Sequence, residues 1–238
     1  MARKGKSRHL KRISAPSILP VKKKGSVWLK KPLPGMHRKE EAIPLGVLLR
    51  DVLGVAETMK EAKKLLKSGE VLVDGKQVRE EGFGVGVMDV VSIPKLGKNY
   101  RVLLVKDKLR FFEIPQEEAG IKLCKIVDKK IVGNSRIQLN LHDGRNYVIE
   151  KEEDQFKTGD TLRMGIPGQK LEGFLKLEKG ARCYIAKGRH AGEIAVLDDI
   201  LERAGSKESD ARLHKENGSE IITLKSYLFV VDSKFQIP

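Results

Sequence analysis

Residues 58–78, TMKEAKKLLKSGEVLVDGKQV, place the pattern of a short helix directly before the pattern of a tight β-hairpin. Thr58 and Glu61 have the spacing of a capping box, and Gly69 suits the end of the helix. The dipeptide Asp74-Gly75 stands between two short apolar runs and predicts a two-residue type I′ turn. Any fold open to this chain must therefore pack one side of this helix and one face of this hairpin.

The predicted helix has two different sides. At about 100° per residue, Met59, Ala62, Leu65 and Leu66 share one arc, which we expect to pack against the core. The remaining arc is cationic and carries Lys60, Lys63, Lys64 and Lys67. The Asp74-Gly75 turn returns Lys76 and Arg79 as further candidates for the same cationic surface.

Basic residues are concentrated before this segment. The chain has 238 residues and a net charge of +15, and residues 1–40 hold thirteen of its 47 Lys and Arg but only one of its 32 Asp and Glu. A segment this basic repels itself unless a polyanion neutralises it, and nucleic acid does so with counterion release. A solubilising tail is the alternative. Prolines and glycines interrupt residues 8–39, which argues against a helix lying on a membrane.

The remaining pattern is mostly β. Residues 43–54 predict a core-facing helix from Leu45, Leu48, Leu49 and the following apolar positions, ended by Gly54. From Pro94 onward, short apolar runs alternate with turn signals, and Ile137, Leu139 and Leu141 predict a half-exposed antiparallel sheet.

We therefore expect an α+β, mostly β chain in four parts. Residues 1–42 are a basic extended arm that orders on its partner, and 43–93 are a helix-helix-hairpin domain. Residues 94–170 are a central domain resembling a small β-barrel, and 171–238 are a second β domain.

The helix-hairpin segment resembles a known RNA-binding fold. The spacing of EAKKLLKSGEVLVDGKQV (61–78) is similar to that of the fold named after bacterial small-subunit ribosomal protein four. The chain departs from the general pattern in two places, at PLG (44–46) and at Met88. With RHLKRISAP (8–16) and KTGDTL (157–162), these departures resemble the archaeal and eukaryotic type of that protein, the S-four-e family, over essentially the whole chain.

A second resemblance lies near the C-terminus. KGARCYIAKGRHAGEIAVL (179–197) is similar to a KOW motif, which implies an SH3-like barrel over 171–238 with Gly192 as its key glycine. The loop of Lys187, Arg189 and His190 offers cations at a tight turn, which suits a phosphate backbone. KOW barrels also bind proteins; we favour RNA contact by this loop.

Trp28 is the only tryptophan, and it lies between two lysine clusters. It could stack on an unpaired base, or it could anchor the arm against the protein's own barrel. We favour the anchor.

Enzymatic and metal sites are not expected. The five histidines are scattered without ligand spacing to Cys or carboxylates, and no nucleotide-binding loop or nucleophile motif is present. Cys124 and Cys183 predict two free thiols rather than a disulfide. We expect no cofactor, no small-molecule substrate and no membrane partner.

The resemblance implies a non-enzymatic constituent of the small ribosomal subunit, acting in the cytoplasm during translation. Its partners would be small-subunit rRNA, in the 5′ domain, and neighbouring ribosomal proteins. Two alternatives stay open: a KOW-type transcription or translation factor outside the ribosome, and an RNA-binding subunit of an RNA-modifying enzyme. The candidate RNA-binding residues are Arg3, Lys4, Lys6, Arg8, Lys11, Arg12, Lys22, Lys23, Lys24, Lys30, Lys31, Arg38, Lys60, Lys63, Lys64, Lys67, Lys76, Arg79, Lys187, Arg189 and His190.

Overall fold

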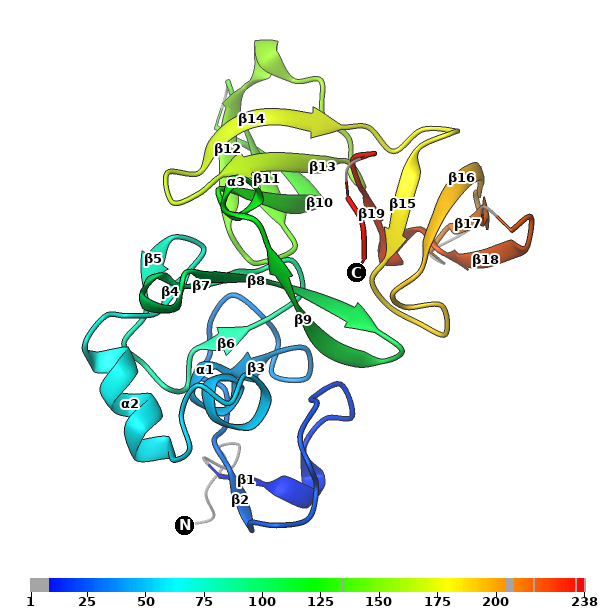
Figure 1. The fold of residues 1–238 in the computed structure, drawn as a ribbon. Coiled ribbons are helices and arrows are strands. Elements are labelled where there is room, and N and C mark those ends of the chain that lie inside the picture. Colours follow the sequence, from blue (N-terminus) through cyan, green and yellow to red (C-terminus); the bar gives the residue numbers. More distant parts are fainter. Residues whose placement is uncertain (1–8, 134, 204–207, 216, 234, 238) are drawn as a thin grey trace, which may run out of the picture.

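The computed structural model describes residues 9–133, 135–203, 208–215, 217–233 and 235–237. Figure 1 shows a mostly β molecule with few and short helices. Its described strands form three five-stranded sheets and two two-stranded sheets. Within the described residues, no helix has the length and apolar content that crossing a membrane requires.

The basic arm is folded onto the rest of the protein. Strand β1 (Leu10–Lys11) pairs antiparallel with β2 (Trp28–Leu29), and a 3-10 turn covers Arg12–Ser14. Leu10, Ala15, Leu19 and Leu29 are buried in the same core cluster as the first helices. We expected an arm that orders on its partner; in the structure the apolar side chains of the arm already pack into the core of the protein.

The first predicted helix is present but irregular. Strand β3 (Ile43–Pro44) pairs with β6 (Gly84–Val85) and leads into α1 (Leu45–Val47) and a π-helical turn (Leu48–Val52). Leu45, Leu48 and Leu49 are fully buried as their spacing predicts. Gly54 then ends the helical segment with a positive φ of 63°.

Helix α2 (Met59–Lys67) forms as predicted. The Thr58 hydroxyl accepts a hydrogen bond of 3.2 Å from the backbone N–H of Glu61, which confirms the predicted cap. Ala62 and Leu66 are buried, and Met59 and Leu65 pack against the same cluster.

The first five-stranded sheet continues past the expected domain end at residue 93. Its order is β5-β4-β7-β8-β9, and every pair is antiparallel. A 3-10 turn (Pro94–Leu96) joins β7 directly to β8, so the expected boundary falls between two paired strands. The strands are β4 (Leu72–Val73), β5 (Lys76–Gln77), β7 (Val90–Ile93), β8 (Lys98–Val105) and β9 (Lys108–Ile114).

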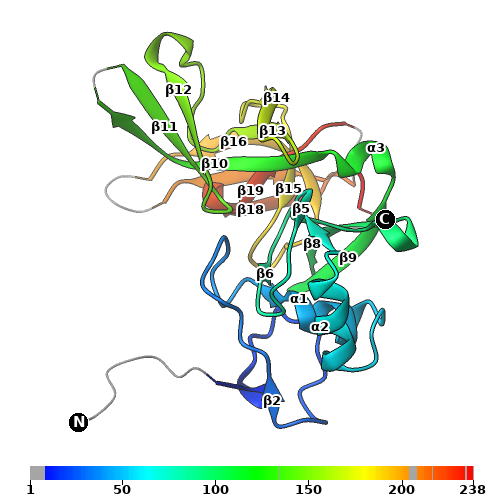
Figure 2. The ribbon, with the colours of Figure 1, turned by 90° about the vertical axis from the view of Figure 1, so that its left-hand side faces the viewer.

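The second sheet follows the short helix α3 (Gln116–Ala119) and has the order β12-β11-β10-β13-β14. Ile137, Leu139 and Leu141 of β11 are buried, as their alternation predicts. Part of β10 and the β11–β12 pair project from the body (Figure 2). The strands are β10 (Ile121–Val132), β11 (Arg136–Leu141), β12 (Asn146–Glu150), β13 (Thr161–Gly165) and β14 (Lys170–Leu175), with a 3-10 turn at Lys151–Glu153.

The third sheet has the order β18-β17-β16-β15-β19 and its own apolar core around Cys183, Ile185 and Leu213. Strand β17 lies in a stretch, residues 202–219, that is rich in charged and polar residues. The strands are β15 (Arg182–Ile185), β16 (Ile194–Leu201), β17 (Asp210–His214), β18 (Glu220–Leu224) and β19 (Leu228–Val230), with a 3-10 turn at Lys225–Tyr227.

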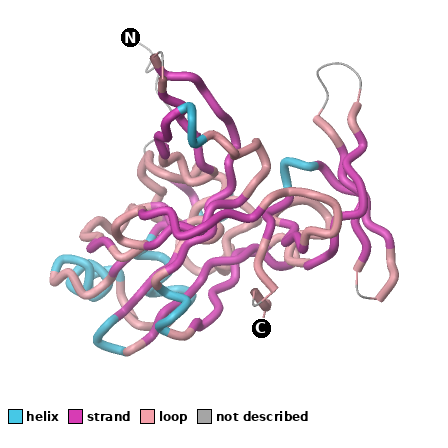
Figure 3. The backbone as a smooth tube through the Cα atoms, turned by 90° about the horizontal axis from the view of Figure 1, so that it is seen from above, coloured by secondary structure: helices cyan, strands magenta, loops and turns pink. Residues whose placement is uncertain are grey.

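The arm and the helices lie at one end of the molecule. Figures 1 and 2 both place β1, β2, α1 and α2 at the lower end, away from the second and third sheets. Seen from above, most of the helical segments lie on the left and the strands of the C-terminal sheet on the right (Figure 3). The segments with the greatest density of candidate cations therefore share one end.

Candidate nucleic-acid interface

Helix α2 carries the cationic side that its sequence predicts. Lys60, Lys63, Lys64 and Lys67 are all exposed, while Ala62 and Leu66 on the opposite side are buried. The separation follows from the helical period, since residues three and four apart share a face. Four ammonium groups on one helix side form a compact site for phosphates.

One carboxylate links this helix to the arm. Glu81 Oε1 lies 2.8 Å from Lys30 Nζ and 3.1 Å from Lys63 Nζ. The hydrogen bond from Lys30, with Lys63 adding to it, holds the pKa of Glu81 at about 2. Lys30 and Lys63 are therefore partly neutralised by the protein itself, unlike a lysine that faces only solvent.

The hairpin points its turn inward. Lys76 and Arg79 are exposed, as expected for candidate contacts. The Asp74 side chain is completely buried, and a Cβ on Gly75 would lie 2.9 Å from Pro167 Cβ of the second sheet's β13–β14 connection. The positive φ values of Asp74 (49°) and Gly75 (72°) agree with the predicted type I′ turn. The turn thus joins two sheets.

The arm divides its cations between surface and interior. Lys11, Lys22, Lys23, Lys24 and Arg38 are exposed. Arg3, Lys4, Lys6 and Arg8 lie outside the described residues, and Lys31 is half-buried.

Arg12 was expected to contact phosphate, but the structure places it in the interior of the protein. It is buried, with 8% of its surface exposed, and it donates a hydrogen bond of 2.9 Å to Asp51 Oδ2. It also donates to Ser26 Oγ at 3.3 Å and to the Lys22 carbonyl. Arg12 therefore fastens the loop of residues 22–26 to the first helix and is not available to a phosphate.

The C-terminal loop is in part an internal contact. Lys187 and Arg189 are exposed, but Lys187 Nζ lies 2.6 Å from Glu41 Oε1, and His190 Nδ1 lies 3.1 Å from Glu193 Oε2. A Cβ on Gly192, where φ is +91°, would lie 2.7 Å from Val105 Cα. The loop thus presses on the β8–β9 turn through a position that only glycine fits.

Trp28 does not anchor the arm against a barrel, contrary to the interpretation we favoured. Its relative exposure is 57%, and its ring centroid lies 5.5 Å from that of His9. Leu29, its neighbour in β2, is the buried residue. Successive strand residues face opposite sides, so burying Leu29 turns Trp28 outward.

Beneath these surfaces lies a buried ionic cluster that the sequence had not indicated. Lys122 Nζ of β10 lies 2.7 Å from Asp74 Oδ2, 2.6 Å from Asp89 Oδ1 and 3.0 Å from Asp143 Oδ2. All four side chains are fully buried. Burial alone would lower the pKa of Lys122, but the three carboxylates outweigh it and raise that pKa. Lys122 therefore stays charged and joins the first sheet to the second.

Two more cations complete the cluster. Arg145 donates a hydrogen bond of 2.6 Å to Asp74 Oδ2. His37 of the arm lies 2.8 Å through Nε2 from Asp89 Oδ2, which also accepts from the N–H of Gly86 at 2.8 Å. Burial alone would lower the pKa of His37, but Asp89 more than offsets it and the pKa is raised. With His37 protonated, three cations balance three carboxylates.

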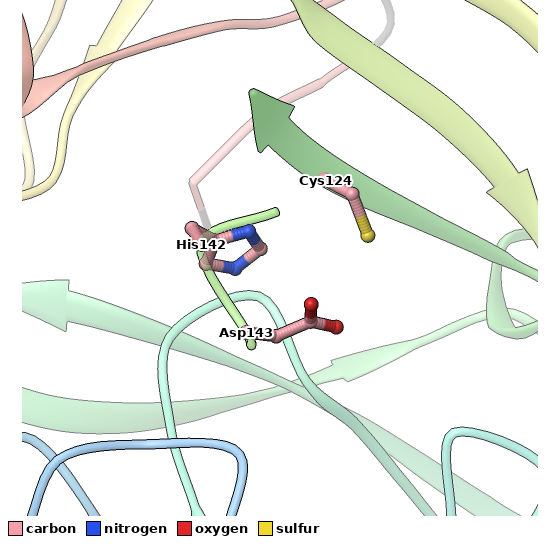
Figure 4. A group of neighbouring side chains, drawn as sticks. All are labelled: Cys124, His142 and Asp143. Atoms are coloured by element: carbon pink, nitrogen blue, oxygen red, sulfur yellow. The ribbon is translucent and has the colours of Figure 1, made fainter. Parts of the chain in front are cut away.

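The same region contains a Cys-His-Asp group (Figure 4). Ligand atoms of Cys124, His142 and Asp143 lie within 4.8 Å of one another, although their spacing had not predicted it. Lys122 already contacts Asp143, and burial raises the pKa of the Cys124 thiol. Burial, with Lys122 adding to it, lowers the pKa of His142 to about 4. Because a thiol and a nearby ammonium disfavour a metal ion, we assign this group a structural role.

Both Cys124 and Cys183 are free, as predicted.

The sequence does contain one signal of the buried cluster. Lys122 and Lys125 interrupt the apolar pattern of β10, and both are buried. Lysine is almost never fully buried unless it is paired, so buried lysines in a central strand require partners that only the tertiary structure supplies.

Sequence models of three described families match the chain in series. The RS4NT domain matches residues 4–40, the S4 domain matches 45–91, and the ribosomal family S4e matches 96–171. The three matches cover the arm, the helix-hairpin and most of the second sheet.

Known proteins match over nearly the full length. The small ribosomal subunit protein eS4 of Methanocaldococcus jannaschii is 44% identical over 97% of this chain and 96% of its own length. The eS4 of Methanothermobacter thermautotrophicus is 42% identical over 97% of this chain and 95% of its own. A crystal structure of 30S ribosomal protein S4e from Thermoplasma acidophilum superposes with a TM-score of 0.69 at 33% identity, covering 82% of this chain and 96% of that one.

Proposed function

Because the chain belongs to the S4e family of small-subunit ribosomal proteins, we propose that it binds small-subunit rRNA as a structural constituent of the small ribosomal subunit. The family is one of ribosomal structural proteins and not of enzymes. The role supports translation by fixing the shape of folded RNA.

The lysine side of α2 carries this proposal. Lys60, Lys63, Lys64 and Lys67 are exposed on a helix within the segment that matches the S4 domain. Lys60, Lys64 and Lys67 can each neutralise a backbone phosphate without rearrangement of the helix, whereas Lys63 shares its charge with Glu81. The exposed arm cations Lys11, Lys22, Lys23, Lys24 and Arg38 extend the surface at the same end of the molecule.

Recognition in this proposal is mainly of RNA shape and backbone. The deep major groove of A-form RNA hides its base edges, so phosphates and 2′-hydroxyls are what lysines can reach. Family resemblance favours the 5′ domain of the small-subunit rRNA as the site. Arg3, Lys4, Lys6 and Arg8 would extend the contacts beyond the folded arm, and neighbouring ribosomal proteins would complete the surroundings in the cytoplasmic ribosome.

The parts of the chain have separate tasks in this proposal. Residues 43–93 dock on RNA, residues 94–170 hold the arm and the hairpin in place through the Lys122 cluster, and 171–238 form a KOW-like module. Arg189 is the exposed cation of that module's loop that we assign to RNA. The buried ion pairs of Lys122 connect these parts, so the RNA-docking surface is held in a fixed position relative to the second sheet.

The test is co-sedimentation with ribosomal subunits in a sucrose gradient. We expect the chain to co-migrate with small subunits and to stay bound in moderate salt. A KOW-type transcription or translation factor would instead remain in ribosome-free fractions, and that result would refute the proposal. Changing Lys60, Lys63, Lys64 and Lys67 together to Glu should abolish rRNA binding while the circular dichroism spectrum stays unchanged.

A further inference from the structure

An exposed tryptophan is unusual enough in a folded segment to require a reason. Trp28 keeps 57% of its surface exposed although the neighbouring residue Leu29 is buried. Ile13 and Val27, at 71% and 66%, are exposed in the same arm. Burial of a large exposed ring against a partner is energetically favourable, so an exposed tryptophan indicates a binding surface.

The backbone beneath the indole is held in place. Trp28 pairs with Lys11 across the β1–β2 ladder, and Arg12 N–H donates 2.9 Å to the carbonyl of Val27. The Arg12 guanidinium binds Asp51, Ser26 and the Lys22 carbonyl on the other side of the loop. The strand position of Trp28 is thus set before any partner arrives, which lowers the entropic cost of stacking on it.

The charge around Trp28 favours a nucleic acid. Residues 9–38 contain no Asp or Glu, and Lys11 lies directly opposite Trp28 in the ladder. Lys22, Lys23 and Lys24 are exposed in the loop that leads to β2. An apolar protein partner would not require this uniform positive charge, whereas an unpaired base arrives with its own phosphates.

We propose that Trp28 is a stacking site for an unpaired base of single-stranded RNA, with Lys11 and Lys22–Lys24 holding the adjacent phosphates. This inference rests on the proposed RNA-binding function. It adds that the RNA element is an unpaired base and that Trp28 contacts that base. The site is indifferent to sequence, because every base offers a flat face to the ring.

Trp28 is the only tryptophan of the chain, so its fluorescence reports on this site alone. The full chain is titrated with a short single-stranded oligoribonucleotide, with the same oligomer lacking its bases, and with inorganic polyphosphate. We expect only the oligomer with bases to quench the fluorescence. Equal effects of all three probes, or no effect of the oligomer, would overturn the proposal.

Three substitutions give an independent measure. Trp28→Leu should weaken binding of the oligomer by about 5- to 100-fold, and Trp28→Phe should retain part of it. Ile13→Ala is the matched control, since it removes an exposed apolar side chain of the same arm, and it should change affinity by less than about twofold. Equal effects of Trp28→Leu and Ile13→Ala would show a general apolar contact instead.

The two proposals fail in different ways. Binding of full-length small-subunit rRNA, measured by filter retention, tests the proposed function. If rRNA binds while the oligomer neither quenches nor depends on Trp28, only the stacking site is refuted. If Trp28→Leu weakens assembly into small subunits but not binding of the oligomer, Trp28 contacts a protein, and the stacking site is again refuted.

Discussion

His37 and Asp89 are joined by a contact of 2.8 Å between Nε2 and Oδ2, although 52 residues separate them in the chain. Their side chains are only 5% and 0% exposed. This contact attaches the arm to the first sheet at the Lys122 cluster. An arm held by a buried ion pair is a structural part of the protein, and its surface cations are presented in a fixed arrangement.

The His37–Asp89 pair predicts a pH-dependent stability. Because the pKa of His37 is raised above 6.5, the pair stabilises the fold fully below that pH, and the contribution is lost as pH rises through the raised value. The titratable groups around His37 are Asp89, Lys122, Asp143 and His142, whose ring centroid lies 6.3 Å from that of His37. Urea unfolding between about pH 6 and pH 9 should therefore show a loss of stability that His37→Gln abolishes.

The contribution of Asp89 to stability depends on pH in the opposite direction from that of His37. Burial alone would raise the pKa of Asp89, but Lys122 and His37 outweigh it and hold that pKa below 3.8. Its contribution is present above its ordinary pKa and is lost only as pH falls well below it. An NMR titration in which His37 titrates below 6.5 would contradict this account. His214→Gln, which removes an exposed contact with Asp198 instead of a buried one, serves as the control, and the pH-dependent loss should persist in it.

Removing the ammonium group of Lys122 should destabilise the protein severely. Lys122→Met leaves three buried carboxylates with one fewer cation, and a cost of about 3–5 kcal/mol in the free energy of unfolding is expected. Chemical denaturation measures it. Lys130→Met in the same strand is the control, because its side chain is 65% exposed, and it should cost no more than about 0.5 kcal/mol. Similar costs for the two variants would mean that the buried cluster does not join the sheets.

Gly192 should be far less tolerant of a side chain than Gly218. Both have positive φ, 91° and 75°, but a Cβ at 218 meets nothing within 4 Å. Gly218→Ala should therefore cost only the backbone strain, about 1–2 kcal/mol. Gly192→Ala adds a clash with the Val105 backbone and should cost about 1–3 kcal/mol more. Thermal unfolding compares the two, and equal costs would refute a tight contact at Gly192.

The charge of the arm should set part of the salt dependence of rRNA binding. Deleting residues 1–40, the simplest test from sequence, would also remove buried Leu10, Leu19 and Leu29. The sharper test changes Lys22, Lys23 and Lys24 to Gln. Removal of one phosphate-binding lysine should lower the log–log salt slope by about 0.7–0.9, so the triple change should lower it by about 2–3.

The control for that measurement uses three exposed lysines of the second sheet's region. Changing Lys151, Lys157 and Lys170 to Gln removes the same charge from positions outside the proposed surface. The salt slope of rRNA binding by this triple variant should match that of the unchanged protein. If both triple variants lower the slope equally, binding follows net charge and not the arrangement of the arm.

Local patterns predicted local structure well. The cap at Thr58, the lysine side of α2, the Asp74-Gly75 turn and the alternation in β11 depend on neighbours within a few residues, and the structure confirms them. Strands β10 and β17 are harder to predict, because Lys122 and Lys125 break the apolar period of β10 and the segment around β17 reads as polar. In both strands the burial that stabilises them comes from distant parts of the chain.

By itself the sequence determined that this is a basic, mostly β protein of the S4e family with a lysine-faced helix. Only the tertiary structure decided which cations are free to bind. Arg12 is sequestered by Asp51, Lys187 is paired with Glu41, and Trp28 is turned outward by the burial of Leu29. The physical reason is that a charge or a ring acquires its role from groups far away in sequence, and folding alone brings those groups within contact distance.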